Sequence, residues 1–262
     1  MNKLSFDAYT LKWFAIIAMV LNHIAIAFYS VLPFPILLPA YAIGGLTYTI
    51  MSFFVVEGYR HTSNLKKYIL RLLIFGLIAQ SVHPMVLGVT AIVPGLHLNI
   101  MFTIILSLLV LLMYDKIKMR ILFWLLFIIA CILSMIMDLY FVAILMTLLY
   151  YVIKKDNLRR TLPGIVGGML FIVLTLPLLF VQFAPDAELY GGMGMSKELA
   201  MAAPTFAIGC FIGAILIRNY NNDRGRRAKW LFYIAYPLHL AVLAGIAVAM
   251  GITEFSLFGF RV

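Results

Sequence analysis

Long apolar runs separated by short polar segments dominate the chain. A helix needs about 20 apolar residues to cross a hydrocarbon core of about 30 Å. The pattern therefore predicts nine transmembrane helices, over residues 11–31, 42–60, 67–87, 97–114, 119–136, 138–153, 162–184, 201–218 and 229–250. Almost nothing except Asp138 separates the fifth run from the sixth. These two runs form either a tight hairpin or a pair in which one segment is partly re-entrant.

The segments between the runs alternate in charge. With the N-terminus inside, all of the 20 lysines and arginines except Lys197 and Arg261 fall in inner segments. Short cytoplasmic loops carry such an excess of basic residues, so we expect the N-terminus inside and the C-terminus outside. The outer segments carry prolines and glycines instead, and we expect loops there, over residues 30–42, 83–97 and 185–200. The glycine cluster at 191–194 is either an ordinary turn or a flexible gate.

The composition excludes a soluble protein. The chain is 65% hydrophobic and 11% charged, whereas typical soluble domains are about 45–50% apolar and about 25% charged. The net charge of +10 is divided among short clusters, so we expect no nucleic-acid partner. Cys131 and Cys210 lie in separate apolar runs, which excludes a disulfide scaffold. We expect one all-α domain over residues 1–262, a polytopic integral membrane helical bundle of about nine transmembrane helices.

Ionisable residues inside the predicted helices mark candidate sites, because each costs about 2.5–3.5 kcal/mol on insertion scales. These residues are His23, Glu57, Asp138 and His239. On the first helix, Lys12 and His23 lie on nearly the same face, about 16 Å apart along the axis. His239 lies beyond Lys229 on the last helix and reaches a similar depth. Each histidine either bonds a neighbouring carbonyl as a packing contact or takes part in chemistry.

Basic residues gather at the predicted inner end of these helices. The cluster contains Lys12, Arg60, Lys66 and Arg71. It reflects either topology and attraction to lipid headgroups or a site for an anionic ligand. Arg71 lies within an apolar run, where an anionic partner is more strongly required. Glu57 lies about one turn before Arg60, so it either pairs with Arg60 at this interface or remains a buried carboxylate.

Polar residues mark the predicted outer end as well. Asn99 and Thr103 share one face of the fourth helix, and His97 lies just before it. Asp138, with Tyr140, caps the short connection between the fifth and sixth runs. The sequence thus predicts a two-sided site, with cations at the inner end, a histidine and a carboxylate midway, and polar groups at the outer end.

Several segments together carry a family resemblance. They are LKWFAIIAMVLNHIA from Leu11, FFVVEGYRHTSNLKKYILRLLIFGLIAQ from Phe53, LNIMFTIILSLL from Leu98, Asp138 with Tyr140, and KWLFYIAYPLHLAVL from Lys229. The chain resembles the TraX family, membrane proteins whose named member acetylates the N-terminus of conjugative pilin. The resemblance extends over residues 11–245 and is thinnest over 155–225.

TraX proteins are in turn similar to the transmembrane acyltransferase superfamily, which includes bacterial sugar O-acetyltransferases. Lys12 and His23 match its spacing of a basic residue, ten positions and a histidine. FFVVEGY resembles its Phe-Phe-x-x-Ser-Gly-Phe, with Glu57 in place of serine. The family usually has aspartate just before this histidine, where this chain has Asn22, so Glu57 or Asp138 would support His23 from another helix, or His23 works unpaired. The resemblance implies transfer of an acetyl group from cytoplasmic acetyl-CoA to an acceptor at or across the bacterial cytoplasmic membrane.

An acyltransferase needs a base, a donor site and an acceptor site. We expect His23 to be the general base, Glu57 to orient it, and His239 to polarise the thioester carbonyl or position the acceptor. The residues expected to hold the coenzyme A phosphates are Lys12, Arg60, Lys66 and Arg71. The residues expected to bind the acceptor are His97, Asn99, Asp138 and Tyr236. We expect no metal, and membrane lipid as the surroundings.

Two other functions remain open from the sequence. A small proton-coupled transporter would use the same intramembrane histidine and glutamate as a proton relay, although no repeat relates the two halves of the chain. A lipid-facing immunity or assembly partner would need no catalytic residue. For the acyltransferase, the acceptor is an envelope molecule, either a peptide or pilin-like protein, a glycan or a lipid.

Overall fold

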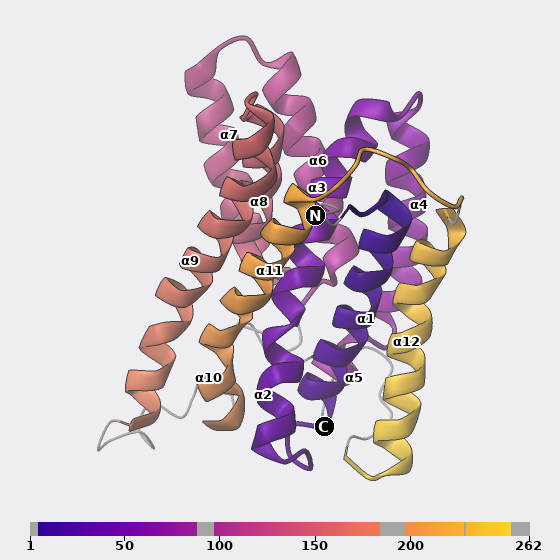
Figure 1. Cartoon of the computed structure of the whole chain (residues 1–262), viewed down its shortest axis with the longest axis vertical. Coiled ribbons are helices and arrows are strands. Elements are labelled where there is room, and N and C mark those ends of the chain that lie inside the picture. Colours follow the sequence, from indigo (N-terminus) through magenta and orange to yellow (C-terminus); the bar gives the residue numbers. More distant parts are fainter. Residues whose placement is uncertain (1–4, 88–96, 184–196, 228, 253–262) are drawn as a thin grey trace.

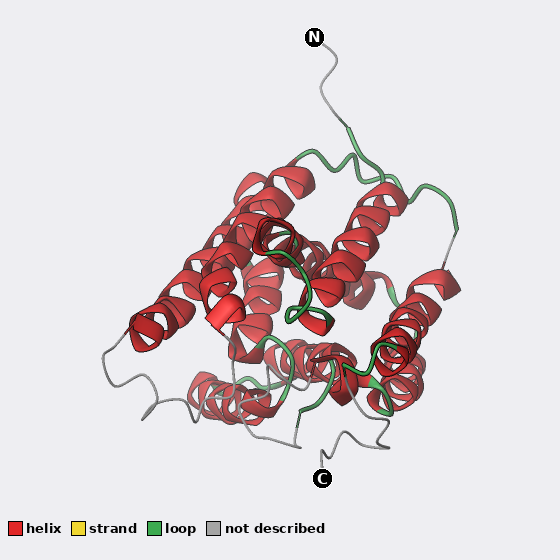
Figure 2. Cartoon of the chain, turned by 90° about the horizontal axis from the view of Figure 1, so that it is seen from below, coloured by secondary structure: helices red, strands yellow, loops and turns green. Residues whose placement is uncertain are grey.

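The computed structural model describes residues 5–87, 97–183, 197–227 and 229–252 of the 262-residue chain. Over these residues the protein is a bundle of helices joined by loops, with no β-strand (Figures 1 and 2). The elements are α1 (Ala8–Ala27), α2 (Phe34–Ala42), α3 (Gly44–His61), α4 (Leu65–Gln80), α5 (His83–Leu87), α6 (Ile100–Lys116), α7 (Arg120–Leu133), the 3-10 turn η2 (Ser134–Ile136), α8 (Tyr140–Val152), α9 (Asp156–Phe183), α10 (Lys197–Ala202), the 3-10 turn η4 (Ala203–Thr205), α11 (Phe206–Arg218) and α12 (Lys229–Ala249). The all-α fold class is confirmed.

The helices are suited to a membrane. Among the described residues, five helical stretches are long and apolar enough to span one: Ala8–Ala27, Phe34–His61, Asp156–Pro177, Lys197–Arg218 and Trp230–Ala249. Arg120–Ile136 and Tyr140–Val152 are shorter apolar helices. Large apolar side chains cover the outside of the bundle, as Ile121 on α7 and Val173 on α9 illustrate with exposed fractions of 74% and 65%. Such a surface requires lipid around it. The number of nine spans and the orientation remain predictions.

The first predicted outer loop, residues 30–42, is wrong in part, because most of it is helix α2. Pro35 stands in the first turn, where its missing N–H costs nothing. Leu37 on the following turn is fully buried, so packing stabilises a short helix that contains a second proline, Pro39. The two later outer segments lie mostly outside the described residues, including the glycine cluster at 191–194.

The third predicted helix, residues 67–87, is divided in two. Helix α4 ends at Gln80, and α5 begins at His83 after a two-residue turn. The amide of Gln80 bonds the segment that leads into α6: its Nε2 donates to the carbonyl of His97 at 2.7 Å, and its Oε1 accepts from the N–H of Asn99 at 3.0 Å. The break redirects the chain so that His83 faces the interior, where its side chain is fully buried.

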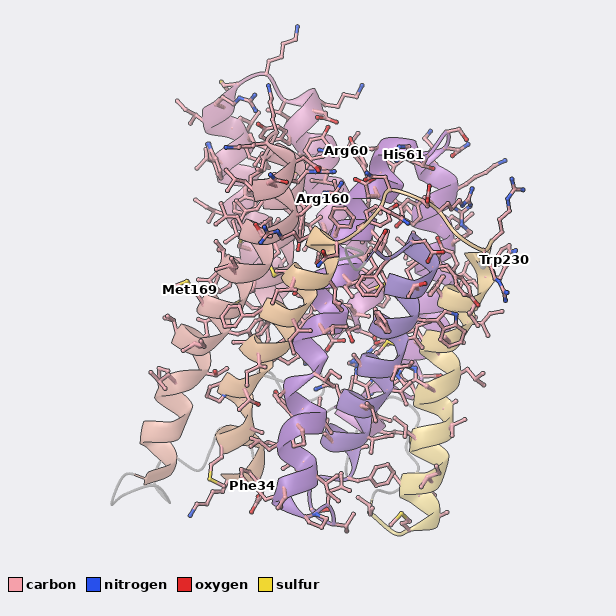
Figure 3. The ribbon with its side chains drawn as sticks, viewed as in Figure 1. Phe34, Arg60, His61, Arg160, Met169 and Trp230 are labelled. Atoms are coloured by element: carbon pink, nitrogen blue, oxygen red, sulfur yellow. The ribbon has the colours of Figure 1, made fainter. Side chains whose placement is uncertain are left out.

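Charged contacts join several helix ends at one end of the bundle. Glu57 on α3 pairs with Arg159 on α9 at 2.8 Å. Asp115 on α6 accepts hydrogen bonds from Tyr59 of α3 at 2.8 Å and from Tyr151 of α8 at 2.7 Å. Figure 3 shows Arg60, His61 and Arg160 at this end and Phe34 at the opposite end. We call it the charged end; it is the end predicted to face the cytoplasm.

Small residues bring α3 and α11 into close contact. A Cβ atom on Gly45 would meet the carbonyl oxygen of Phe206, and one on Gly209 would meet the carbonyl oxygen of Ala42. At Gly213 the nearest atom would be a side-chain carbon of α3, at 2.8 Å. Close backbone approach through small residues is a common way for helices to associate in lipid.

The hairpin of α7 and α8 is short. Helix α8 has 13 residues, which is about 20 Å at 1.5 Å per residue, less than a hydrocarbon core of about 30 Å. Only three residues, 137–139, connect η2 to α8, so the connection is the tight hairpin. Leu139 and Tyr140 have φ angles of 63° and 49°, a left-handed backbone that costs energy in non-glycine residues. This turn places Asp138 inside the bundle.

Candidate functional site

Two histidines from the first and last helices meet in the interior. The Nδ1 atom of His23 on α1 lies 2.6 Å from the Nε2 atom of His239 on α12, and the two rings stack with centroids 4.9 Å apart. His239 Nδ1 lies 2.8 Å from the carbonyl oxygen of Ala235. Since a carbonyl only accepts hydrogen bonds, His239 Nδ1 carries a proton, and its Nε2 is the acceptor in a neutral ring. His23 Nδ1 is then the donor. In a neutral His23 ring, the Nε2 atom is therefore unprotonated and carries a lone pair.

Tyr236 completes an aromatic group around this pair. Its ring lies edge-on to His23 and to His239, with centroids 6.3 Å and 5.5 Å away. Its hydroxyl is buried and has no hydrogen-bond partner of good geometry among the described residues. A buried hydroxyl without a partner is costly, and here it lies beside two imidazoles.

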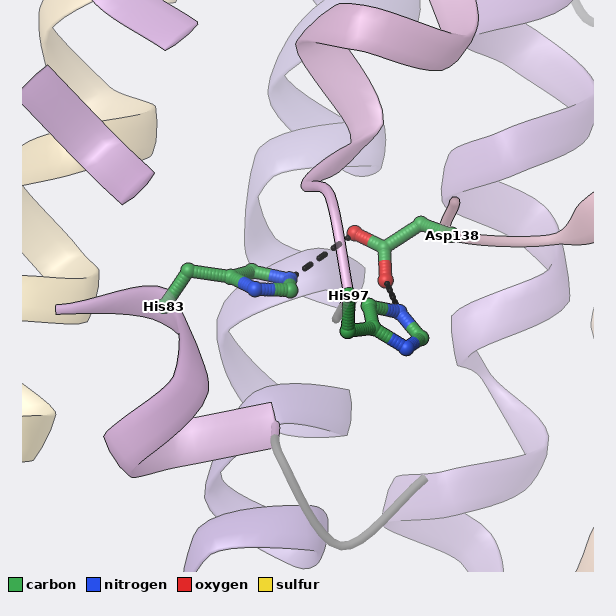
Figure 4. A group of neighbouring side chains, drawn as sticks. All are labelled: His83, His97 and Asp138. Carbon is green, nitrogen blue, oxygen red and sulfur yellow. Dashed lines mark hydrogen bonds and ion pairs between the residues drawn. The ribbon is translucent and has the colours of Figure 1, made fainter. Parts of the chain in front are cut away.

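A second polar cluster joins His83, His97 and Asp138 (Figure 4). The Oδ1 atom of Asp138 lies 2.6 Å from His97 Nε2, and its Oδ2 atom lies 3.1 Å from His83 Nε2. The side chain of His83 is fully buried, that of His97 is 4% exposed and that of Asp138 is 16% exposed. Asp138 and His83 are also within electrostatic range of His23. Four of the five histidines of the chain therefore gather in one region.

Backbone hydrogen bonds hold the second cluster in place. The N–H of Leu98 donates to the carbonyl of Ile136 at 2.7 Å, and the N–H of Asp138 donates to the carbonyl of Leu98 at 3.0 Å. The hydroxyl of Thr103 donates to the carbonyl of Asp138 at 3.0 Å. The segment before α6 is thus bonded to the turn before α8 next to His97 and at Asp138.

A basic pocket opens near the charged end. Its volume is about 680 Å³, and the cations among its lining residues include Lys12, Arg71, Arg224 and Arg226. The ammonium of Lys12 lies 4.8 Å from the ring centroid of Phe54, which attracts it by a cation–π interaction. The guanidinium of Arg71 donates to the hydroxyl of Tyr233 at 3.5 Å. Several positive charges around one cavity suit a phosphate-bearing ligand.

The N-terminal segment supports the rim of this pocket. Asp7 caps α1 by accepting the backbone N–H of Thr10 at 2.7 Å. Hydrogen bonds from the side chain and the backbone of Thr10 lower the pKa of Asp7, so its carboxylate stays ionised at neutral pH.

The deeper part of the pocket is apolar. Val55, Leu72, Met101 and Ile104 line it, and the same side chains belong to the buried cluster that contains Tyr236. His23 is not among the residues that line this pocket. The apolar cluster therefore shares side chains with the pocket lining and, through Tyr236, has ring contacts with both His23 and His239.

The structure does not bring all predicted site residues together. Glu57 lines the pocket, but its carboxylate pairs with Arg159 at 2.8 Å and with Arg60 at 3.8 Å, so it does not orient His23. Arg60 also donates to the carbonyl of Tyr151 at 3.0 Å and is not among the pocket residues. Lys66 is exposed and outside the pocket lining as well. Of the predicted donor-site cations, Lys12 and Arg71 line the pocket.

Two asparagines have contacts within the fold. Asn99 is fully buried and caps α6; its Nδ2 donates to the carbonyl of Gly76 at 2.8 Å and to Gln80 Oε1 at 2.9 Å. These bonds use both N–H groups of its side-chain amide, so Asn99 has none left to donate to the molecule that receives the acetyl group.

Asn22 donates to the carbonyl of Tyr41 at 3.0 Å and so joins α1 to α2. His239, rather than a carboxylate, is bonded to His23.

Sequence reasoning missed His83, Arg224 and Arg226. His83 lies in a predicted outer segment beside a proline. The signal that could have found it is that a largely buried Asp138 needs positively charged or hydrogen-bonding partners. Arg224 and Arg226 belong to a basic loop whose charge is explained by topology alone. The folding of that loop over α1 decides that they face the pocket.

Comparison with known proteins identifies the family of the chain. The family model described as TraX protein matches residues 7–247. The chain belongs to the TraX family. The matched region includes every residue of the two histidine clusters and of the basic pocket. A relative, the "Probable fimbrial assembly protein FimC, serogroup H1" of Dichelobacter nodosus, is 27% identical over an alignment of 262 positions, gaps included, that covers 92% of this chain and 96% of that protein. No solved structure matches the TraX chain.

Proposed function

We propose that this TraX protein is a membrane acyltransferase that moves an acetyl group from acetyl-CoA to a pilus-associated or other envelope acceptor. The observation that carries the proposal is the 2.6 Å contact between His23 Nδ1 and His239 Nε2, beside the contact of His239 Nδ1 with a backbone carbonyl. With both rings neutral, these contacts leave the Nε2 atom of His23 unprotonated. A neutral imidazole with one free lone pair is the ordinary general base at neutral pH.

The basic pocket is the proposed donor site. Lys12, Arg71, Arg224 and Arg226 hold the phosphates of coenzyme A near the charged end. Below these cations the lining becomes apolar, which suits the pantetheine arm. Lys12 and His23 are about 16 Å apart along α1, so the thioester has to enter the region of Leu72 and Met101 to approach His23.

The transfer step uses the His23–His239 pair and Tyr236. An acceptor hydroxyl or amine attacks the thioester carbonyl carbon while His23 Nε2 takes its proton. The Tyr236 hydroxyl donates a hydrogen bond to the oxyanion that forms. As the carbon–sulfur bond breaks, the imidazolium of His23 returns the proton to the coenzyme A thiolate. Through its Nδ1–H, the same imidazolium donates to His239 Nε2, and Asp138 supplies a nearby negative charge.

The family supports a role in pilus biology. The Dichelobacter nodosus relative is named a probable fimbrial assembly protein, and the TraX family is linked to acetylation of pilin. On this proposal the protein lies in the bacterial cytoplasmic membrane, and its acceptor is a pilin-like protein or another envelope molecule.

A purified preparation tests the proposal. We expect the protein in detergent or proteoliposomes to bind radiolabelled acetyl-CoA and to hydrolyse or transfer its acetyl group. Replacement His23→Ala lowers the rate of acetyl release or transfer by about 100- to 10,000-fold, because a general base contributes that much. Donor binding persists, because His23 does not line the donor pocket.

Met169→Ala is a suitable control, since this side chain points away from the bundle on α9 (Figure 3) and is 58% exposed. Unimpaired transfer by the folded His23→Ala protein would contradict the proposal. Proton uptake that depends on His23 without any use of acetyl-CoA would favour a proton-coupled transporter instead.

A further inference from the structure

We propose that His83, His97 and Asp138 form a binding site for a divalent transition metal ion, with Zn²⁺ as the ion that fits best. The ligand atoms of these three side chains all lie within 4.8 Å of one another. They come from three different parts of the fold: His83 from α5, His97 from the segment before α6, and Asp138 from the turn before α8 (Figure 4). Distant segments thus bring three metal-ligating side chains to one point.

The donor set indicates the ion. Two imidazoles and one carboxylate, with a fourth position left open, match the ligands of zinc sites that keep a water or substrate position. Zinc requires these atoms at about 2.0–2.2 Å from the ion. Ligands at that distance in a tetrahedral site lie about 3.3–3.5 Å from one another, so the hydrogen-bonded separations of 2.6 Å and 3.1 Å between Asp138 and the two imidazoles have to lengthen by less than about 1 Å to admit the ion.

Charge and hydrogen bonding also favour an ion. Among the described residues, Asp138 has salt-bridge partners only in the two histidines, and no lysine or arginine pairs with it. A buried carboxylate requires compensating positive charge, which a divalent ion supplies. The Nδ1 atom of His83 is buried and has no hydrogen-bond partner in the described part of the chain. His83 therefore has one ring nitrogen, Nε2, directed at Asp138 and one, Nδ1, that no described residue engages.

The surrounding backbone is built to hold these residues. Gln80 bonds the carbonyl of His97, and Thr103 bonds the carbonyl of Asp138. Left-handed φ angles at Leu139 and Tyr140 immediately follow Asp138. Strained residues of this kind concentrate at functional sites, where the surrounding structure maintains them. The contacts of Gln80 and Thr103 fix the backbone from which the side chains of His97 and Asp138 project.

The position of the site gives the ion a chemical use. An acceptor hydroxyl or amine bound to the ion at the open position would lose its proton more readily. His23 lies within electrostatic range of Asp138 and His83, so the proposed base is in the same region. This use rests on the proposed function, whereas metal binding itself does not. The two are separable by experiment.

Direct metal analysis is the test. The full-length protein, purified in detergent through an affinity tag without histidines, is analysed by mass spectrometry for bound metals. We expect about one zinc ion per chain. After chelation, titration with Co²⁺ gives the visible absorption of a tetrahedral site, and Zn²⁺ raises the unfolding temperature because it binds the folded state.

Variants locate the site. His83→Gln, His97→Gln and Asp138→Asn each lose the stoichiometric zinc and the Co²⁺ absorption. His61→Gln keeps both, because His61 is 76% exposed and lies at the charged end. Absence of zinc and of the Co²⁺ absorption in the folded wild-type protein would overturn the proposal and leave the three residues as a hydrogen-bonded His–Asp–His relay. Because this arm needs no variant, misfolding of Asp138→Asn does not obscure it.

The outcomes also separate the two proposals. Zinc bound at these residues in a protein that never uses acetyl-CoA supports the metal site and contradicts the acyltransferase. Acetyl transfer that continues unchanged in metal-free protein that binds no Co²⁺ supports the acyltransferase and contradicts the metal site.

Discussion

His239 Nδ1 bonds a carbonyl oxygen of its own helix, and this single contact sets the direction of the hydrogen bond to His23. A carbonyl acceptor fixes the proton on His239 Nδ1, and the lone pair on His239 Nε2 then holds the proton of His23 Nδ1. His239 in this arrangement is a positioning residue, and His23 carries the basic nitrogen. The same relation between an orienting acceptor and a catalytic imidazole is found in hydrolase triads.

This reading predicts different effects at the two histidines. We expect His239→Ala to lower the acetyl-transfer rate less than His23→Ala does, because the base is still present but less well oriented. His239→Gln keeps more activity than His239→Ala, because its side-chain oxygen accepts the proton of His23 Nδ1. Measurement of kcat across pH for the three variants checks the order. Equal losses in His239→Gln and His239→Ala would show that hydrogen bonding to His23 is unimportant.

For single residues, the sequence predicted how deep a side chain lies along its helix better than it predicted which residue that side chain contacts. The ten-residue interval between Lys229 and His239 and the eleven-residue interval between Lys12 and His23 place both imidazoles at similar depth, and the structure brings them together. The nearer of the two arginine partners of Glu57 was not predictable in the same way. Arg60, one turn away, is a partner at 3.8 Å as its spacing indicates. The nearer partner, Arg159 at 2.8 Å, lies 102 residues further along the chain, and the packing of α9 against α3 brings it there.

At the scale of helices, hydropathy determines which segments are helical, and packing determines where they bend. The apolar runs predicted most helices within a few residues of their ends. The break after Gln80 and the helix over Phe34–Ala42 were not predicted, because each depends on contacts with distant segments, the first with His97 and Asn99. The hydrophobic pattern of a segment does not indicate which distant residues it will contact.

The contact between α3 and α11 provides a test at this scale. We expect Gly209→Leu to lower the free energy of unfolding by about 1–3 kcal/mol, the usual cost of overpacking, because even its Cβ would collide with the backbone of α2 and α3. Thermal unfolding in detergent measures the change. Gly245→Ala on α12 is the matched control, since nothing lies within 4 Å of the added atom, and its stability stays the same or rises slightly. Equal stability of the two variants would contradict tight packing at Gly209.

For the whole molecule, the distribution of charge is the main guide to orientation. The charged end holds Arg60, His61 and Arg160 (Figure 3), in agreement with the inner side predicted from the basic loops. The fold class followed from composition and hydropathy alone. The location of the second histidine cluster did not, because it requires knowing that α8 is too short to carry Asp138 to the far surface.

Cysteine labelling tests the predicted orientation. In a protein without Cys131 and Cys210, we expect a membrane-impermeant maleimide added to intact cells to label Ser30→Cys and not Asp223→Cys. Both positions are exposed, and they belong to opposite sides in the nine-helix arrangement. Permeabilised cells, in which both variants should react, provide the control. The reverse pattern in intact cells would mean that the N-terminus lies outside.

The segment before α1 is bonded to the loop that follows α11. Phe6 exchanges backbone hydrogen bonds with Asn219 and Asn221, and the N–H of Ala8 donates to the carbonyl of Asp223 at 2.8 Å. The loop that supplies Arg224 and Arg226 is therefore held in position by Phe6 and Ala8. A fusion partner or purification tag attached just ahead of Phe6 would disturb the pocket from more than 200 positions away in sequence, so engineering of this protein should leave that junction untouched.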